Sequence, residues 1–172
     1  MACDSKVLRG IAIDCEQSMG GIKKVWLANY DATATVTVTT DKISAISNTA
    51  DYKVYNFKKN TATMTKTLNV DPANGINYVS TELVMQFTKM DTTKRVEIEA
   101  LSLNGVSAIV LDSNGVYWYL GKDEAIYATA GSGQTGQAKT DGNFYSITLT
   151  DESVTWPYEI DKTVVADLPQ DL

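Results

Sequence analysis

The sequence predicts a mainly β domain with one α-helix, and three features carry this prediction. The stretch Val106–Gly121 has two apolar and aromatic runs separated by Asp112–Gly115, whose Asn-Gly pair suits a tight turn. Further runs of alternating side chains lie on both sides of it, between residues 22 and 160. Only Thr92–Leu103 combines a helical spacing of apolar residues with a capping residue before it.

The Val106–Gly121 hairpin is the expected centre of the fold. Both of its arms are apolar on both faces, so each face needs a covering layer. We expect a helix to cover one face, and other strands or a neighbouring subunit to cover the other.

Length and charge limit the possible functions. A chain of 172 residues is one ordinary domain. Its 15 basic and 21 acidic residues give a net charge of −6, which argues against a protein that grips nucleic acid through its phosphates. Residues 1–90 hold 10 basic and 8 acidic residues, whereas residues 91–172 hold 5 and 13. This asymmetry suits either head-to-tail association of identical subunits or a solvated acidic face with an acidic tail.

Residues 1–21 are interpreted as an N-terminal arm before a single β-rich domain at residues 22–160. The arm contains both cysteines, Cys3 and Cys15, which we expect to be free thiols because two cysteines make no disulfide framework in a chain this long. No apolar run approaches the ~20 residues that cross a bilayer, and the first residues lack a signal core. We therefore expect no membrane partner and a soluble protein that stays in the compartment where it is made.

Two strands are expected at the start of the domain. From Ile22 to Tyr30, Val25 and Leu27 alternate with Trp26, which indicates a strand with two apolar faces. Residues 32–40 alternate threonine with valine or alanine, which indicates a second strand with one face made almost wholly of threonine.

The next segment, Asp41–Ser80, is expected to form an extended hairpin arm. Residues 51–60 and Thr61–Val70 would be its two strands, and the basic Lys-Lys-Asn sequence at 58–60 would be its tip. Asp71–Gly75 then forms a strong turn, because proline presets one position and Asn-Gly accepts the next.

This predicted arm contains the chain's candidate interaction residues. Tyr55 and Phe57 would anchor it on a neighbouring subunit, with Lys58 and Lys59 at its tip. The alternative is an ordinary surface hairpin.

The following segment, Asn77–Met90, is predicted to be a strand. Asp91 then offers an N-cap, and we predict a helix at Thr92–Leu103 that ends before Gly105. A strand is the alternative for this segment, because some of its apolar residues also alternate.

The last part of the chain is predicted to be mostly strands. The Trp156–Ile160 segment would lie at a sheet edge because of its proline. The remaining predicted elements are a short strand at Ala125–Ala130, a flexible loop at Gly131–Gln137, a strand at Phe144–Thr150, and an acidic C-terminal tail at residues 161–172.

The sequence offers no strong candidate for catalysis, and we predict no enzyme. It has no histidine, which removes the commonest general base and zinc ligand. Asp112 and Asp123 could pair as carboxylates, but such residues more often solvate turns. Asp112–Gly115 lacks the spaced ligands of a calcium loop, and Gly131–Gly136 is followed by no helix that would hold a phosphate. We predict no catalytic, cofactor-binding or metal-binding residues.

The tryptophans Trp26, Trp118 and Trp156 are interpreted as packing residues. Stacking on nucleic-acid bases would require interleaved basic residues, and only Trp26 has them, in Lys23 and Lys24.

The order of these elements resembles the tail-tube proteins of long-tailed bacteriophages and their relatives in contractile injection systems. The resemblance rests on TELVMQFTKMDTTKRVEIEALSLNG, AIVLDSNGVYWYLG and TGQAKTDGNFYSITLTDESVTWPYEI, within Thr81–Ile160. It implies a β-sandwich or half-open β-barrel with one flanking helix and an extended hairpin that reaches a neighbour.

The resemblance also implies a function. The protein would be a virion protein, assembled in the host cytoplasm, that forms hexameric rings which stack as a tail tube for DNA passage. Its partners would be itself and other tail or head-tail proteins, with DNA as a non-specific cargo and no cofactor. If rings stack, the acidic residues would lie either against the more basic half of the next ring or along the channel, and we favour an acidic channel wall.

Two other functions remain open. The first is a capsid decoration, head-tail connector or ring protein. The second is a β-sandwich carbohydrate-binding module with Tyr117, Tyr119 and Trp156 as its platform. The mass in solution separates these hypotheses. A tube protein should form rings, a decoration protein should form trimers, and a carbohydrate-binding module should be a monomer.

Overall fold

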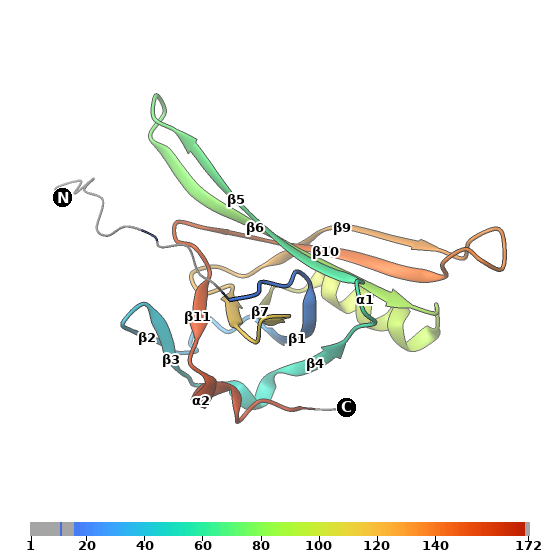
Figure 1. The fold of residues 1–172 in the computed structure, drawn as a ribbon, viewed down its shortest axis with the longest axis horizontal. Coiled ribbons are helices and arrows are strands. Elements are labelled where there is room, and N and C mark those ends of the chain that lie inside the picture. Colours follow the sequence, from blue (N-terminus) through green and yellow to red (C-terminus); the bar gives the residue numbers. More distant parts are fainter. Residues whose placement is uncertain (1–10, 12–15, 171–172) are drawn as a thin grey trace.

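A computed structural model describes residues 11 and 16–170 of the chain, as two β-sheets with one main helix (Figure 1). The mainly β prediction is confirmed, and the two sheets face each other as in a β-sandwich; neither closes into a barrel within the described part. Cys3, Cys15 and most of the predicted N-terminal arm lie outside the described residues.

The larger sheet has seven strands in the order β2-β3-β11-β8-β7-β1-β4. Its strands are β1 (Ile22–Asn29), β2 (Val36–Thr39), β3 (Lys42–Ile46), β4 (Lys53–Asn56), β7 (Val106–Asp112), β8 (Tyr117–Leu120) and β11 (Tyr158–Ile160).

The smaller sheet has four strands in the order β5-β6-β10-β9. They are β5 (Ala62–Asp71), β6 (Ile76–Thr88), β9 (Tyr127–Gln134) and β10 (Phe144–Ser153). The helices are α1 (Thr92–Leu103), the short α2 (Lys162–Val165) and a 3₁₀ turn, η1 (Thr49–Asp51).

The apolar core has two parts, one on each face of the larger sheet. Strand side chains alternate between faces, so one set packs between the sheets and the other set packs against the C-terminal segment. Between the sheets lie Val25, Leu27, Leu83, Met85, Ala108, Val110, Ile147 and Leu149, and on the other face lie Trp26, Ile43, Ile109, Tyr119, Ile160, Val164, Val165 and Leu168.

The predicted hairpin Val106–Gly121 is confirmed as the β7–β8 pair in the larger sheet. Gly115 takes the positive φ of its turn, at +81°, and the Asp112 carboxylate accepts hydrogen bonds from the backbone of Asn114 and Val116. The covering layers differ from the prediction in one respect. The smaller sheet covers one face, but the C-terminal segment covers the other, while α1 packs at the β9–β10 end of the molecule.

The predicted helix is confirmed with the same bounds as α1, Thr92–Leu103. The Asp91 carboxylate caps it by accepting a hydrogen bond from the Lys94 backbone N–H at 2.9 Å. Leu101 is its one fully buried residue among those described, so α1 covers only the end of the inter-sheet core. Neither helix in the described part is long and apolar enough to cross a membrane.

The predicted partners in the extended hairpin were wrong. Residues 53–56 pair with β1, and β5 pairs instead with β6, so the projecting hairpin has its tip at Asp71–Gly75 and not at residues 58–60. The reason is the longer ladder: β5 and β6 form ten registered pairs around a turn in which Gly75 has φ +69°. The Lys-Lys-Asn sequence forms a connection between the two sheets.

The C-terminal segment also differs from the prediction. Residues 161–170 are packed on the larger sheet, and the Trp26 indole N–H donates to the Pro169 carbonyl at 2.6 Å. Strand β11 lies inside the sheet, parallel to β3 and antiparallel to β8, and not at its edge. Pro157 precedes this strand, so the ladder loses no donor.

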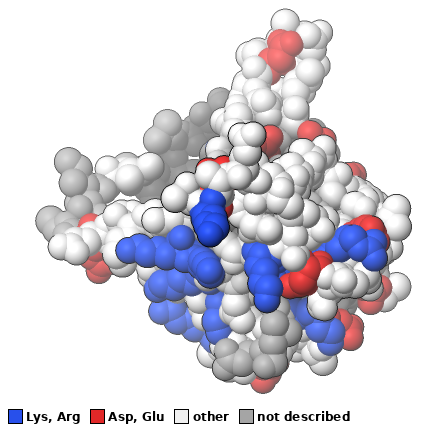
Figure 2. All heavy atoms as spheres, turned by 90° about the vertical axis from the view of Figure 1, so that its right-hand side faces the viewer, with Lys and Arg blue, Asp and Glu red and all other residues white. Residues whose placement is uncertain are grey.

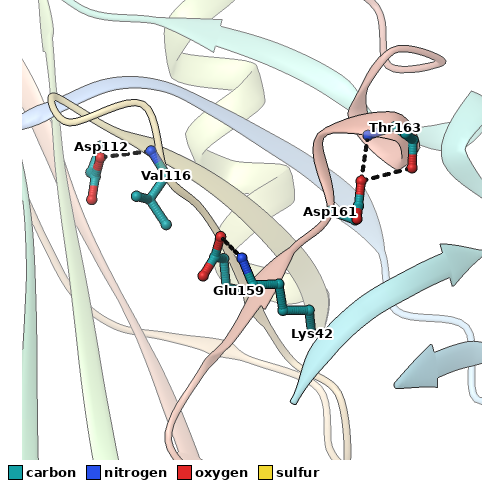
Figure 3. Close-up of polar contacts among 6 residues, drawn as sticks. All are labelled: Lys42, Asp112, Val116, Glu159, Asp161 and Thr163. Atoms are coloured by element: carbon teal, nitrogen blue, oxygen red, sulfur yellow. Dashed lines mark hydrogen bonds and ion pairs between the residues drawn. The ribbon is translucent and has the colours of Figure 1, made fainter. Parts of the chain in front are cut away.

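Polar contacts surround the point where the chain leaves β11 for the C-terminal segment (Figure 3). The Asp161 backbone N–H donates to the Ile43 carbonyl on β3 at 2.9 Å, which joins the segment to the larger sheet. The Lys42 ammonium on β3 contacts the Glu159 carboxylate on β11 at 2.6 Å. Two residues after Glu159 the chain has left the sheet, and there Asp161 accepts hydrogen bonds from the backbone N–H and hydroxyl of Thr163 and caps α2.

Two further predicted boundaries shift. The predicted loop at Gly131–Gln137 is strand as far as Gln134, because Gly133 leaves room for the Tyr145 ring on β10. A Cβ at Gly133 would lie 2.9 Å from that ring. The threonine-rich strand is shorter than predicted, at Val36–Thr39.

Candidate assembly surfaces

The residues considered for catalysis have structural roles. Asp112 holds its turn and also accepts a hydrogen bond from the Trp118 indole at 3.1 Å. Asp123 contacts the Lys122 ammonium at 2.8 Å. Across residues 11 and 16–170, no three His, Cys, Asp or Glu side chains gather in a way that could hold a metal ion.

The aromatic platform of the carbohydrate-binding hypothesis is not formed in this fold. Trp156 is half exposed, but Tyr119 is 5% exposed and lies under the C-terminal segment. The Trp26 and Tyr117 rings pack against each other, with centroids 5.9 Å apart. The two tyrosines and Trp156 therefore do not share one exposed face.

The most prominent feature of the surface is the set of free strand edges. Strands β2 and β4 are the outer strands of the larger sheet, and β5 and β9 are the outer strands of the smaller one. An outer strand has backbone N–H and C=O groups with no partner in its own sheet, so it can pair with a strand of another chain. The edges of the smaller sheet are long, at ten residues in β5 and eight in β9.

One face of the smaller sheet has no covering element in the described part of the chain, and the cross-strand rows given below contain no lysine or arginine. Leu83 and Ile147 point to the core, so the alternate residues of each strand point away from it. The cross-strand rows on this outer face are Thr63–Val84–Thr148, Thr65–Glu82–Thr150, Thr67–Ser80–Glu152 and Gln86–Ser146–Ser132. The face is thus rich in hydroxyl groups, and its charged side chains in these rows are carboxylates.

The β5–β6 hairpin projects from the body (Figure 1). Strand β10 ends opposite Val79, and residues 68–79, at and beyond this point, are called the overhang. On the core-side face of the hairpin, Leu83 is fully buried, but Leu68 is 48% exposed and Val70 is 56% exposed. These two apolar residues continue the core face past the place where a second sheet covers it.

Lys66 lies at the base of the overhang and contacts the larger sheet. Its ammonium lies 3.4 Å from the centre of the Trp118 ring on β8, a cation–π contact that joins the two sheets. Burial lowers the pKa of Lys66, and the nearby Asp112 carboxylate opposes this shift. The contact marks where packing between the sheets ends, since Leu68, the next residue on the same face, is half exposed.

A groove of about 620 Å³ lies beside the free edge of β4 and is called the β4 groove. It is lined by Lys53–Asn56 of β4, by Phe87 of β6, and by Thr93, Lys94 and Glu97 of α1, among others. The Tyr55 hydroxyl donates a hydrogen bond to the Glu97 carboxylate, which joins the strand to the helix. Burial, followed by this contact with Glu97, raises the pKa of Tyr55 above its usual range.

The four predicted interaction residues lie in or next to this groove and not at the tip of a projecting arm. Tyr55 and Phe57 pack against Phe87, with ring centroids 6.1 and 5.4 Å from it. Both rings belong to the edge of the inter-sheet core, so neither is free to anchor on a neighbour as an extended side chain. Lys58 and Lys59 are exposed on the connection that follows β4.

Basic residues gather on the side of the molecule that contains β4 and α1. Figure 2 shows Lys and Arg side chains across this side, below the hairpin, whose tip contains the acidic Asp71. Lys53 and Lys94 line the groove itself, and among the described residues no ion pair involves Lys53, Lys58 or Lys59. The rim of the groove therefore has positive charge available for a partner.

Sequence reasoning missed the overhang and the groove. The signal for the overhang was present, because Leu68 and Val70 continue the alternation of β5 up to the turn. The groove left no such signal, since its residues come from three separate segments.

Comparison of the chain with protein-family models, curated proteins and solved structures found no match.

Proposed function

We propose that this protein is a structural subunit that joins copies of itself into rings, and that the rings stack into, or join, the tail tube of a tailed bacteriophage. The observation that carries the proposal is the smaller sheet, with two free edges and one uncovered polar face. The resemblance of residues 81–160 to tail-tube proteins supplies the hexameric number and the virion as the location.

The directions of the free edges support ring formation. Each neighbouring pair in the smaller sheet is antiparallel, so β5 and β9 run in opposite directions. When β9 of one copy pairs with β5 of the next, the contact is again antiparallel and the strand order simply repeats. Such a contact joins two different surfaces, and it closes into a ring when the rotation between copies returns to the first copy.

The outer face of the smaller sheet supports a channel wall. In a ring closed through β5 and β9, the sheets of all copies join into one wall with this face on one side. A wall of hydroxyl groups with Glu82 and Glu152, and without basic residues in its rows, repels DNA phosphates and lets DNA slide without binding. It corresponds to the acidic channel wall expected for a DNA conduit, with Glu152 from the acidic half of the chain, residues 91–172, and Glu82 from the other half.

Imaging and solution mass test this proposal. We expect negative-stain images of the purified protein to show rings with a central hole, and light scattering to give a mass of several subunits. A stable monomer at high concentration, with no rings in images of crowded samples, would refute it. Trimers would favour a decoration protein instead.

A second experiment tests the wall. Thr148→Lys places an ammonium group on the outer face of the smaller sheet, and Thr37→Lys places one on the exposed edge strand β2 as a matched control. We expect rings with lysine at position 148 to retain duplex DNA at low salt, and wild-type rings and the control not to. Equal DNA binding by both variants would count against a channel lined by this face.

A further inference from the structure

Part of the apolar face of the overhang has no cover among the residues that the structure describes. Its core-side residues Leu68 and Val70 are half exposed, although residues on the same face of the same hairpin are fully buried inside the body. Exposed aliphatic side chains in a row favour association with a second surface. The only described charged residue at the tip is Asp71, whose pKa is lowered by the Asn74 side chain and which therefore stays ionised.

The β4 groove has complementary properties. Its floor contains the Phe87 and Tyr55 rings, and it lies beside a free strand edge. Of its charged lining residues, Lys94 is paired with Asp91 and Glu97 accepts a hydrogen bond from Tyr55, whereas Lys53 is in no ion pair among the described residues. An extended segment can add to such an edge through backbone hydrogen bonds while its side chains fill the groove. The ammonium group of Lys53, with those of Lys58 and Lys59 on the connection after β4, suits the acidic Asp71 at the tip of the overhang.

The two surfaces cannot meet within one copy. In Figure 1 the hairpin tip points to the upper left, whereas β4 and α1 lie to the right of the centre. A contact between them must therefore join different copies. Because it joins unlike surfaces on opposite sides of the molecule, it propagates from copy to copy instead of ending at a dimer.

We infer that the overhang of one copy docks in the β4 groove of a second copy, with Leu68 and Val70 over the Phe87 and Tyr55 rings. This inference rests on the proposed self-assembly and adds the contact that links one ring to the next. It leaves the edges of β5 within the body and of β9 free to close each ring.

Cross-linking tests this contact directly. All variants have Cys3 and Cys15 replaced by serine. Val70→Cys is combined with Thr93→Cys, at an exposed position that lines the groove, and the protein is treated with a short bis-maleimide. The matched control combines Val70→Cys with Thr37→Cys on the distant edge strand β2. We expect a ladder of covalent multimers from the first pair, and cross-linked species at least tenfold less abundant from the control.

Exchanging charges between the overhang and the groove tests the same contact, with ring stacking as the measurement. Val70→Lys brings a further positive charge next to Lys53, and we expect it to raise the protein concentration needed for stacking by about tenfold, from the lost burial of one aliphatic side chain. Lys53→Glu in the same chain should restore stacking. Circular dichroism and the Tm check that each variant is folded.

The outcomes separate this inference from the proposed function. Rings that form and stack normally with Val70→Lys, together with no ladder from the Val70–Thr93 pair, overturn the docking and leave ring formation standing. Equal ladders from both cysteine pairs also overturn it. Absence of rings in the wild-type protein refutes the proposed function, and the cross-linked ladder then still decides whether overhang and groove meet.

Discussion

Asp151 is a buried carboxyl group that the fold tolerates at a cost in stability. It lies on β10 with 6% exposure, directly opposite Thr81 in the register of the smaller sheet. Burial raises the pKa of Asp151 to about 6, although a hydrogen bond from the Gly121 backbone N–H opposes this shift. The nearby carboxylates, Asp123 first among them, raise the pKa further.

The sign of the effect on stability follows from this raised pKa. The folded state holds the proton more tightly than the unfolded chain, whose aspartate pKa is 3.8. The contribution of Asp151 to the free energy of unfolding is therefore fully favourable below pH 3.8, and it is lost as the pH rises through about 6. At about 1.4 kcal/mol for each pKa unit, the ionised form costs the folded state about 3 kcal/mol at neutral pH.

We predict that Asp151→Asn stabilises the protein at neutral pH. Asparagine keeps an oxygen that accepts the hydrogen bond from Gly121 but carries no charge. The free energy of unfolding should rise by up to about 3 kcal/mol at pH 7.5 and change little at pH 4.

Urea unfolding followed by tryptophan fluorescence, at a protein concentration too low for assembly, measures this difference. Other aspartates, such as Asp91, have lowered pKa values, so their protonation in acid destabilises the fold. They are present in both the wild-type protein and the variant, so their effect cancels in the difference between the two. Thr148→Asn, on the outer face of the same strand and without a titratable group, is the matched control and should show no such dependence on pH. A gain for Asp151→Asn that is equal at both pH values, or a loss at pH 7.5, would refute the reasoning.

Three further predictions follow from packing, hydrogen bonding and charge. Gly133→Ala should destabilise the fold by about 1 kcal/mol in urea unfolding because its Cβ would press on the Tyr145 ring, whereas Gly20→Ala, which meets nothing within 4 Å, should not. Tyr55→Phe should cost about 1 kcal/mol through loss of the hydrogen bond to Glu97, and a neutral result would show that water replaces this contact. Rings should persist on light scattering at roughly 1 M salt, where the Debye length is ~3 Å; dissociation would point to charge-driven contacts between rings.

Local sequence signals determined the elements whose structure depends on neighbouring residues. The α1 helix begins and ends where the Asp91 cap and the apolar spacing predict. The β7–β8 turn forms where Asn-Gly stands, because only a few residue types accept the positive φ of Gly115. In both cases the contacts that fix the element lie within a few residues of each other, so the sequence alone predicts the element.

The tertiary structure alone decided which strands pair. Residues 53–56 and β5 both alternate in a way that fits a hairpin, but β4 joins β1, where Val54 and Tyr55 each find a different part of the core. Alternation specifies that a segment is a strand and which residues share a face; it does not specify the partner.

The candidate surfaces also depend on which strands pair across long distances in the sequence. Leu68 and Val70 look like core residues in the sequence, and they are exposed only because β5 and β6 extend past β10 and past the sheet that would cover them. Tyr55 and Phe57 look like exposed anchors, and they are packed because Phe87, from a distant segment, lies beside them. The sequence determines which residues are apolar, whereas the relative lengths and pairing of the strands determine which of them remain uncovered, because burial depends on contacts between segments far apart in the chain.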